Sequence, residues 1–150
     1  MKSIDAKRYT VEFTDKKYII LNNFITSKDY SSAFILVDEN TEQNCLPIFL
    51  DNFSIEMPLE IISIEAGEEN KHIQTCSGVW EALSELGADR KSLIINLGGG
   101  VVTDLGGFVA STFKRGIDFI NIPTTLLSMV DASVGGKTGV DLGALKNQVG

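Results

Sequence analysis

Four short runs stand out in the pattern of hydrophobic and polar positions along the chain. They are Ala33–Val37, Leu59–Ile64, Ser92–Leu97 and Ile117–Ile122, and Pro123 follows the last of them. Runs of about four to eight mainly apolar residues, rich in β-branched side chains, are typical of strands buried on both faces of a sheet. The pattern therefore predicts four core strands.

A helix is predicted after each strand. The helical segments extend from Asp38 to about Asn52, from about Asn70 to Leu86, from Val101 to about Thr112, and from Thr124 to Met129. The second shows apolar residues at helical spacing before a glycine suited to end a helix: Ile73, Cys76, Trp80, Leu83 and Gly87. Strands that alternate with helices form βαβ units, so we expect an α/β fold with a parallel sheet and helices on both faces.

The two ends of the chain follow other patterns. Near the start, the β-rich stretches Tyr9–Phe13 and Lys17–Leu21 flank Asp15-Lys16, which predicts a hairpin. After Asp131 the pattern gives way to glycine, and the last five residues, 146–150, carry polar groups and predict no terminating element.

Composition narrows the class of protein. A chain of 150 residues suits one domain with a core of its own. Its net charge of -7 argues against nucleic acid and against an anionic membrane surface as partners. We find no apolar stretch of about 18 residues and no apolar core of a signal peptide. Cys45 and Cys76 lie far apart, as expected for free thiols in the reducing cytoplasm.

Glycine is concentrated in the second part of the chain, where 11 of the 14 glycines lie at or after Gly98. The segment GGGVVTDLGG, Gly98–Gly107, directly follows a predicted strand and opens a predicted helix. Such a turn lets the backbone approach a diphosphate, whose charge the helix N-terminus favours. Thr103 occupies the place of the third glycine of the dinucleotide fingerprint. Diphosphate binding is the favoured interpretation, and a merely tight strand–helix turn is the alternative.

A second glycine segment, VGGKTG at 134–139, resembles a P-loop only in part. A P-loop requires glycine at the position of Asp131, where an acid would repel phosphate. The glycines and Lys137 could still hold an anionic substrate. His72 is the only histidine, and we expect it at the surface, since a catalytic zinc requires about three protein ligands.

Several charged or polar residues lie among apolar neighbours, where they are costly unless paired or used. Structural ion pairs and a functional site explain this placement equally well. The residues are Asp104, Arg115, Asp131, Lys137, Lys146 and Asn147.

The stretch from Leu97 to Asn147 resembles the 3-dehydroquinate synthase family. The similarity lies in LGGGVVTDLGGF, FKRGIDFINIPTTLLSMVDASVGGKTGVDLG and LKN, in the family's order and spacing. Asp38-Glu39-Asn40 and Gly67–Lys71 agree more loosely, and Thr103 stands where the family commonly has glycine. The resemblance implies a Rossmann-like domain of a two-domain enzyme of the shikimate pathway.

The resemblance also implies the reaction. The family converts the sugar acid phosphate DAHP to 3-dehydroquinate and phosphate, in the route to aromatic amino acids. A substrate hydroxyl is transiently oxidised with NAD⁺, phosphate is eliminated, the ketone is reduced, and ring opening and aldol closure follow. A divalent metal, zinc or cobalt, polarises the substrate oxygens. We expect a cytoplasmic enzyme that is a homodimer when complete.

Carried over by position, the family's functional residues fall into two sets. The NAD contacts are Asp38, Asn40, Glu68, Lys71, Gly99, Gly100, Val101, Asp104, Thr124, Thr125 and Lys146. The substrate contacts, expected to be catalytic, are Arg115, Asp131, Lys137 and Asn147. The family's metal ligands, a glutamate and two histidines, belong to a helical second domain that this chain lacks.

We therefore expect residues 1–150 to be the NAD-binding N-terminal domain of a two-domain enzyme. Three alternatives remain open on the sequence. One is a sister sugar-phosphate cyclase, another is a related NAD-dependent metal alcohol or polyol dehydrogenase, and the third is a non-catalytic nucleotide-binding module.

Overall fold

A four-stranded parallel sheet forms the centre of the computed structural model, which describes residues 2–14 and 18–150. The strand order is β4-β3-β5-β6. The strands are β3 (Ala33–Asp38), β4 (Leu59–Ile64), β5 (Leu93–Gly98) and β6 (Asp118–Pro123). The four predicted strands are thus confirmed to within one residue at each end. β3 and β5 occupy the middle because their apolar residues are buried on both faces.

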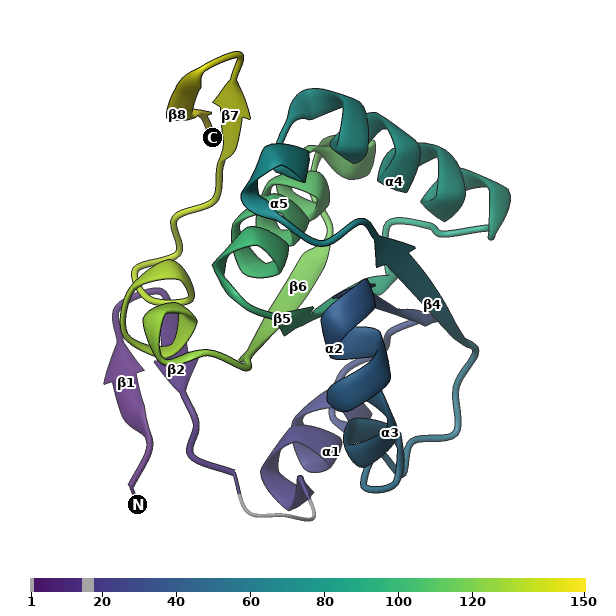
Figure 1. The fold of residues 1–150 in the computed structure, drawn as a ribbon. Coiled ribbons are helices and arrows are strands. Elements are labelled where there is room, and N and C mark those ends of the chain that lie inside the picture. The colour runs from purple at the N-terminus through teal and green to yellow at the C-terminus, as the bar shows by residue number, and fades with distance from the viewer. Residues whose placement is uncertain (1, 15–17) are drawn as a thin grey trace.

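Helices cover both faces of the sheet, as predicted (Figure 1). Alternate residues of β3 point to opposite sides. Phe34 and Leu36 pack in the cluster that includes residues of α4 (Ile73–Glu85) and α5 (Gly100–Thr112). Ile35 and Val37 pack in a second cluster with residues of α1 (Ile19–Thr26) and α3 (Leu46–Leu50). The chain is therefore a three-layer α/β domain with one apolar core on each side of the sheet.

Two small hairpins lie outside the sheet (Figure 1). β1 (Ile4–Ala6) pairs with β2 (Tyr9–Val11) near the N-terminus. β7 (Val140–Leu142) pairs with β8 (Leu145–Val149) at the C-terminus, where the sequence predicted no terminating element. That expectation was wrong, because this hairpin is stabilised by contacts with distant parts of the chain.

The expected N-terminal hairpin was also wrong in its second half. Ile19–Thr26 form α1, so the β-rich residues after position 18 begin a helix that packs Ile25 into the core. Asp15-Lys16 and Lys17 lie outside the described residues. β2 pairs instead with the strand that precedes it.

The helix predicted from Asp38 to about Asn52 is two shorter helices. α2 (Glu39–Asn44) ends before Cys45, and α3 begins at Leu46 with proline in its first turn. Pro47 has no N–H to continue the hydrogen-bond ladder of α2, which explains the break. The segment predicted as helical from Thr124 to Met129 contains the start of a short π-helical turn, η3 (Ser128–Ala132).

The helix after β4 starts later than expected. Residues 68–70 form a short 3₁₀ turn, η1 (Glu68–Asn70), and the ring of His72 accepts the Thr75 N–H over 3.3 Å as the N-cap of α4. The buried face of α4 carries Cys76 and Leu83, as its spacing predicted. Among residues 2–14 and 18–150, no helix is long and apolar enough to cross a membrane.

Candidate functional site

The glycine turn lies at the carboxyl end of a central strand. Gly98 is the last residue of β5, and Gly99 is the N-cap of α5, which has no side chain to accept from the helix's first N–H groups. A Cβ on Gly98 would lie 2.5 Å from the Val102 side chain, and one on Gly99 would lie 3.3 Å from Cγ2 of Thr125. The turn therefore needs glycine to keep its shape, and it presents backbone donors at a helix N-terminus. These features fit the diphosphate of a dinucleotide.

The turn is tied to its neighbours by hydrogen bonds. The Thr124 N–H donates to the Gly98 carbonyl over 3.0 Å, which joins the end of β6 to the end of β5. The Thr103 hydroxyl contacts the carbonyls of Gly99 and Gly100 at 3.2 and 3.3 Å. Thr103, at the position where the family commonly has glycine, therefore hydrogen-bonds to the start of α5 and does not replace a glycine of the 98–100 turn.

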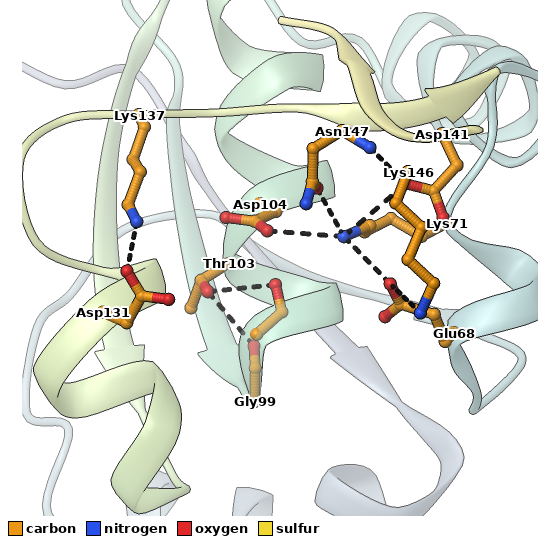
Figure 2. A network of polar contacts seen from close by, with 11 residues as sticks. Glu68, Lys71, Gly99, Thr103, Asp104, Asp131, Lys137, Asp141, Lys146 and Asn147 are labelled. Carbon is orange, nitrogen blue, oxygen red and sulfur yellow. Dashed lines mark hydrogen bonds and ion pairs between the residues drawn. The ribbon is translucent and has the colours of Figure 1, made fainter.

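A buried ammonium organises the other half of the site (Figure 2). The Lys71 side chain is only 4% exposed. Its Nζ lies 3.2 Å from Oε1 of Glu68 and 3.5 Å from Oδ2 of Asp104, and it donates over 2.8 Å to Oδ1 of Asn147. Lys146 reaches the same Glu68 oxygen at 3.6 Å from a largely exposed position. One cluster thus joins η1, α5 and the C-terminal hairpin.

Asp104 is a mostly buried carboxyl group of the cluster, with its side chain 19% exposed. Its position in the first part of α5, one turn after Gly100, faces Lys71. Burial raises the pKa of Asp104 above its ordinary value, although Lys71 acts in the opposite direction. The cost of removing this carboxylate from water therefore exceeds what its cationic neighbours return. Such a group in a site is a candidate for function, because structure alone gives little reason to keep it.

A second pair lies on the other side of Asp104 (Figure 2). The Lys137 ammonium donates to the Asp131 carboxylate, and both side chains are more than half exposed. This hydrogen bond raises the pKa of Lys137. The pair joins η3 to the glycine segment at 135–136. Lys137 and Asp131 therefore form an ion pair, and both side chains remain accessible to solvent.

Other predicted cofactor contacts lie along the same edge of the sheet. Asp38 is the last residue of β3 and caps α2, with its Oδ1 accepting the Thr41 N–H over 2.8 Å. Asn40 is exposed in the first turn of that helix. Thr125 follows β6, and its hydroxyl lies 2.9 Å from that of Ser128. The carboxyl edge of the sheet therefore gathers the predicted contacts from all four strand ends.

Arg115 is the exception. It follows α5 and precedes β6, so it lies at the amino edge of the parallel sheet, opposite the glycine turn. Its side chain is exposed, and its backbone has a φ of 70°. Within this chain the structure does not bring Arg115 to the residues with which the sequence grouped it.

One residue of the cluster was missed by the sequence analysis. Asp141 lies 3.8 Å from Lys71 and accepts the Asn147 N–H over 2.7 Å. The signal that singled out Asp104, a charge between apolar neighbours, also marks Asp141 between Val140 and Leu142. Among residues 2–14 and 18–150, no group of three or more His, Cys, Asp or Glu side chains could hold a metal ion.

Comparison with known proteins places this geometry in a family. The model described as 3-dehydroquinate synthase N-terminal matches residues 61–150. The protein named 3-dehydroquinate synthase in Parabacteroides distasonis is 49% identical over 130 residues, which are 87% of this chain. The chain belongs to the 3-dehydroquinate synthase family. It covers 36% of that relative's length.

Solved structures of related cyclases have the same fold as this member of the 3-dehydroquinate synthase family. A crystal structure of 2-deoxy-scyllo-inosose synthase superimposes with a TM-score of 0.79 at 27% identity, over 88% of this chain and 38% of that one. The 2-epi-5-epi-valiolone synthase of Streptomyces hygroscopicus, solved with NAD⁺ and Zn²⁺ bound, gives 0.74 at 31% identity, over 81% and 34%. The fold is that of the sugar-phosphate cyclases, and the related proteins are enzymes.

Proposed function

We propose that this chain is the NAD-binding N-terminal domain of a 3-dehydroquinate synthase, a lyase that converts DAHP to 3-dehydroquinate and phosphate. The observation that carries the proposal is the placement of the Lys71 cluster beside the glycine turn. Apart from Arg115, the residues that the resemblance assigns to NAD and to substrate then share one edge of the sheet. The family match over residues 61–150 supports the same activity.

The glycines and the lysines of this chain would bind different parts of NAD⁺. Gly99 and Gly100 let the backbone N–H groups of α5 approach the diphosphate of NAD⁺. Lys71 and Lys146 donate hydrogen bonds to cofactor oxygens. NAD⁺ itself, when bound, supplies the hydride acceptor for the transient oxidation.

The substrate would meet the exposed end of the site. Lys137 and Asn147 can donate to the carboxylate, phosphate or hydroxyl oxygens of an anionic sugar. Asp131 accepts from Lys137 and holds its ammonium near the position where a developing oxyanion would lie. The divalent metal, zinc or cobalt, would be held outside this chain, in the second domain.

The experiment that tests this proposal measures phosphate release. We expect the two-domain enzyme, with NAD⁺ and zinc, to release phosphate from DAHP and to form 3-dehydroquinate. The 150-residue chain alone should release none, because its described residues offer no metal site. Phosphate release by the isolated chain would contradict the domain assignment, and an inactive two-domain enzyme would contradict the reaction.

The isolated chain should still bind NAD⁺, with weaker affinity than the two-domain enzyme. The predicted cofactor contacts lie in this chain, but a second domain would close the other side. Calorimetric titration distinguishes the outcomes. Equal affinity for both proteins, or no binding to the isolated chain at millimolar NAD⁺, would contradict this assignment.

A sister cyclase is the second candidate, and one observation favours it. The solved structures that resemble the chain include cyclases with other products, at 27% and 31% identity. Product analysis after incubation with DAHP, and in parallel with a hexose 6-phosphate, separates the candidates. Turnover of the hexose phosphate alone would replace the synthase assignment with the sister activity.

We propose that the complete enzyme is a cytoplasmic homodimer. Because Arg115 lies at the edge opposite the cluster, a substrate contact by this residue requires another copy of the chain. Mixing Arg115→Ala and Lys137→Met enzymes, each of low activity alone, should then restore part of the activity. No restoration after subunit exchange would contradict this arrangement. Cys45 and Cys76 are both free thiols, which supports a reducing compartment.

A further inference from the structure

Asp141 lies in the middle of β7, between a fully buried Val140 and a largely exposed Leu142. Its side chain is 12% exposed and points toward the body of the domain, into the Lys71 cluster. A carboxylate in this position loses most of its water, so its retention calls for a specific role.

Asp141 contacts both Lys71 and Asn147, through its backbone N–H and its side-chain carboxylate. Its backbone N–H donates to the Lys71 carbonyl over 2.9 Å, and its Oδ1 lies 3.8 Å from the Lys71 Nζ. The same Oδ1 accepts the backbone N–H of Asn147 over 2.7 Å. Asp141 therefore links a predicted cofactor contact to a predicted substrate contact.

The backbone of Asn147 depends on that last hydrogen bond. Asn147 has a φ of 53°, in the left-handed region, which an asparagine tolerates better than most residues. β8 has five residues against three in β7, and the pairing register shifts between Val140 and Leu142. This bulge turns the Asn147 N–H toward the Asp141 carboxylate. The Asn147 side chain then lies where its Oδ1 accepts from Lys71.

We propose that Asp141 is a positioning residue that fixes Asn147 and Lys71 relative to each other, and so joins the substrate side of the site to the cofactor side. This inference rests on the proposed function for the roles of Asn147 and Lys71. The role belongs to the acceptor oxygen more than to the charge, because the 2.7 Å bond to Asn147 is much closer than the 3.8 Å approach to Lys71. Lys71 also keeps Glu68 and Asp104 as ionic partners.

The two variants that test the proposal are Asp141→Asn and Asp141→Ala in the two-domain enzyme. Both contacts of the carboxylate go to one oxygen, Oδ1, and an amide oxygen in the same place can keep both. Alanine removes the acceptor and leaves the Asn147 N–H without it. Asp51→Ala, an exposed aspartate at the end of α3, is the matched control.

We expect Asp141→Ala to lower kcat/KM on the order of ten- to a hundredfold, with a raised KM for the sugar phosphate and weaker NAD⁺ binding. Asp141→Asn should recover most of this loss, within about fivefold of wild type. The control should match wild type. A merely structural role would lower the melting temperature and leave KM of the folded enzyme unchanged.

A second measurement separates this proposal from the proposed function. Hydrogen exchange of peptides spanning residues 143–150 in the two-domain enzyme should be faster in Asp141→Ala than in wild type and in Asp141→Asn. An inactive wild type would overturn the function, while exchange and NAD⁺ titration would still test the link between Asp141, Asn147 and Lys71. The proposal is overturned if Asp141→Ala behaves like wild type in kinetics and exchange, or if Asp141→Asn is no better than Asp141→Ala.

Discussion

The Nζ of Lys71 donates a 2.8 Å hydrogen bond to the side-chain oxygen of Asn147, although 76 positions separate the two residues. This bond joins the segment before α4 to the second strand of the C-terminal hairpin. Lys71 is 4% exposed, so the bond forms away from bulk water, where it is stronger than at the surface. The two residues therefore stabilise the fold and build the site with the same atoms.

Lys71→Met should destabilise the domain by about 2–4 kcal/mol. The change leaves the Glu68, Asp104 and Asp141 carboxylates without their shared ammonium, and Asp104 and Asp141 are mostly buried. Urea denaturation of the purified chain measures the effect. The matched control is Lys146→Met, whose exposed pair with Glu68 should contribute less than about 1 kcal/mol. Equal effects of the two substitutions would show that burial of Lys71 does not matter.

Two helical glycines should respond in opposite ways to alanine. A Cβ on Gly106 of α5 would overlap Oδ1 of Asn96 and lie 2.9 Å from Leu36, so Gly106→Ala should cost about 1–3 kcal/mol. A Cβ on Gly78 of α4 meets no atom within 4 Å, so Gly78→Ala should gain about 0.5–1 kcal/mol. Thermal melting of both variants checks this. A stabilising Gly106→Ala would mean that α5 packs less closely on β5 than described.

Lys137→Met should separate catalysis from stability. The Lys137–Asp131 pair is exposed on both sides, so its loss should change the free energy of unfolding by less than about 1 kcal/mol. Losing a charge-assisted contact to substrate should lower kcat/KM of the two-domain enzyme roughly ten- to a hundredfold, with NAD⁺ affinity little changed. If melting temperature falls sharply while kcat/KM per folded molecule is unchanged, Lys137 serves the loop and not the reaction.

Asp104 should give the domain a measurable pH dependence. Burial raises its pKa in the folded state above the ordinary value of 3.8, so the folded protein binds the proton more tightly than the unfolded chain does. The stability contributed by this group is therefore present below 3.8 and is lost as pH rises through the folded-state pKa. Asp104→Asn should gain stability relative to wild type as pH rises from that range to neutrality. Denaturation of both proteins at several pH values checks the sign, and a difference that shrinks with rising pH would contradict it.

The strands and the two long helices were predictable from the sequence because local pattern and burial agree there. The runs 33–37 and 92–97 are apolar on both faces, and the structure buries them at the centre of the sheet. Gly98 lets the chain pass from β5 toward α5 without a clash, since a Cβ at this position would lie 2.5 Å from the Val102 side chain. These elements need no distant partner to be recognised.

The C-terminal hairpin was not predictable because its stability comes from distant residues. The Asp141 N–H bonds the Lys71 carbonyl, and His72 and Asp141 form a β-bridge. The sequence of the hairpin itself does not indicate that Lys71 and His72 are its partners. The role of Asp141 was missed for the same reason, although its place between two apolar residues carried the signal. Arg115 lies at the amino edge of the sheet because it falls between the end of α5 and the start of β6. Grouping charged residues by their apolar neighbours in the sequence does not take this topology into account.

The link between Lys71 and the hairpin also bears on the order of folding. Bringing Lys71 and Asn147 together closes a long loop, and the entropy of that closure is repaid only when the intervening strands and helices are already packed. The hairpin should dock late, after β5 and α5 have formed. The Lys71–Asn147 contact, which would join the cofactor side of the site to the substrate side, is then assembled as one of the last steps of folding, on a sheet and helices that are complete before it.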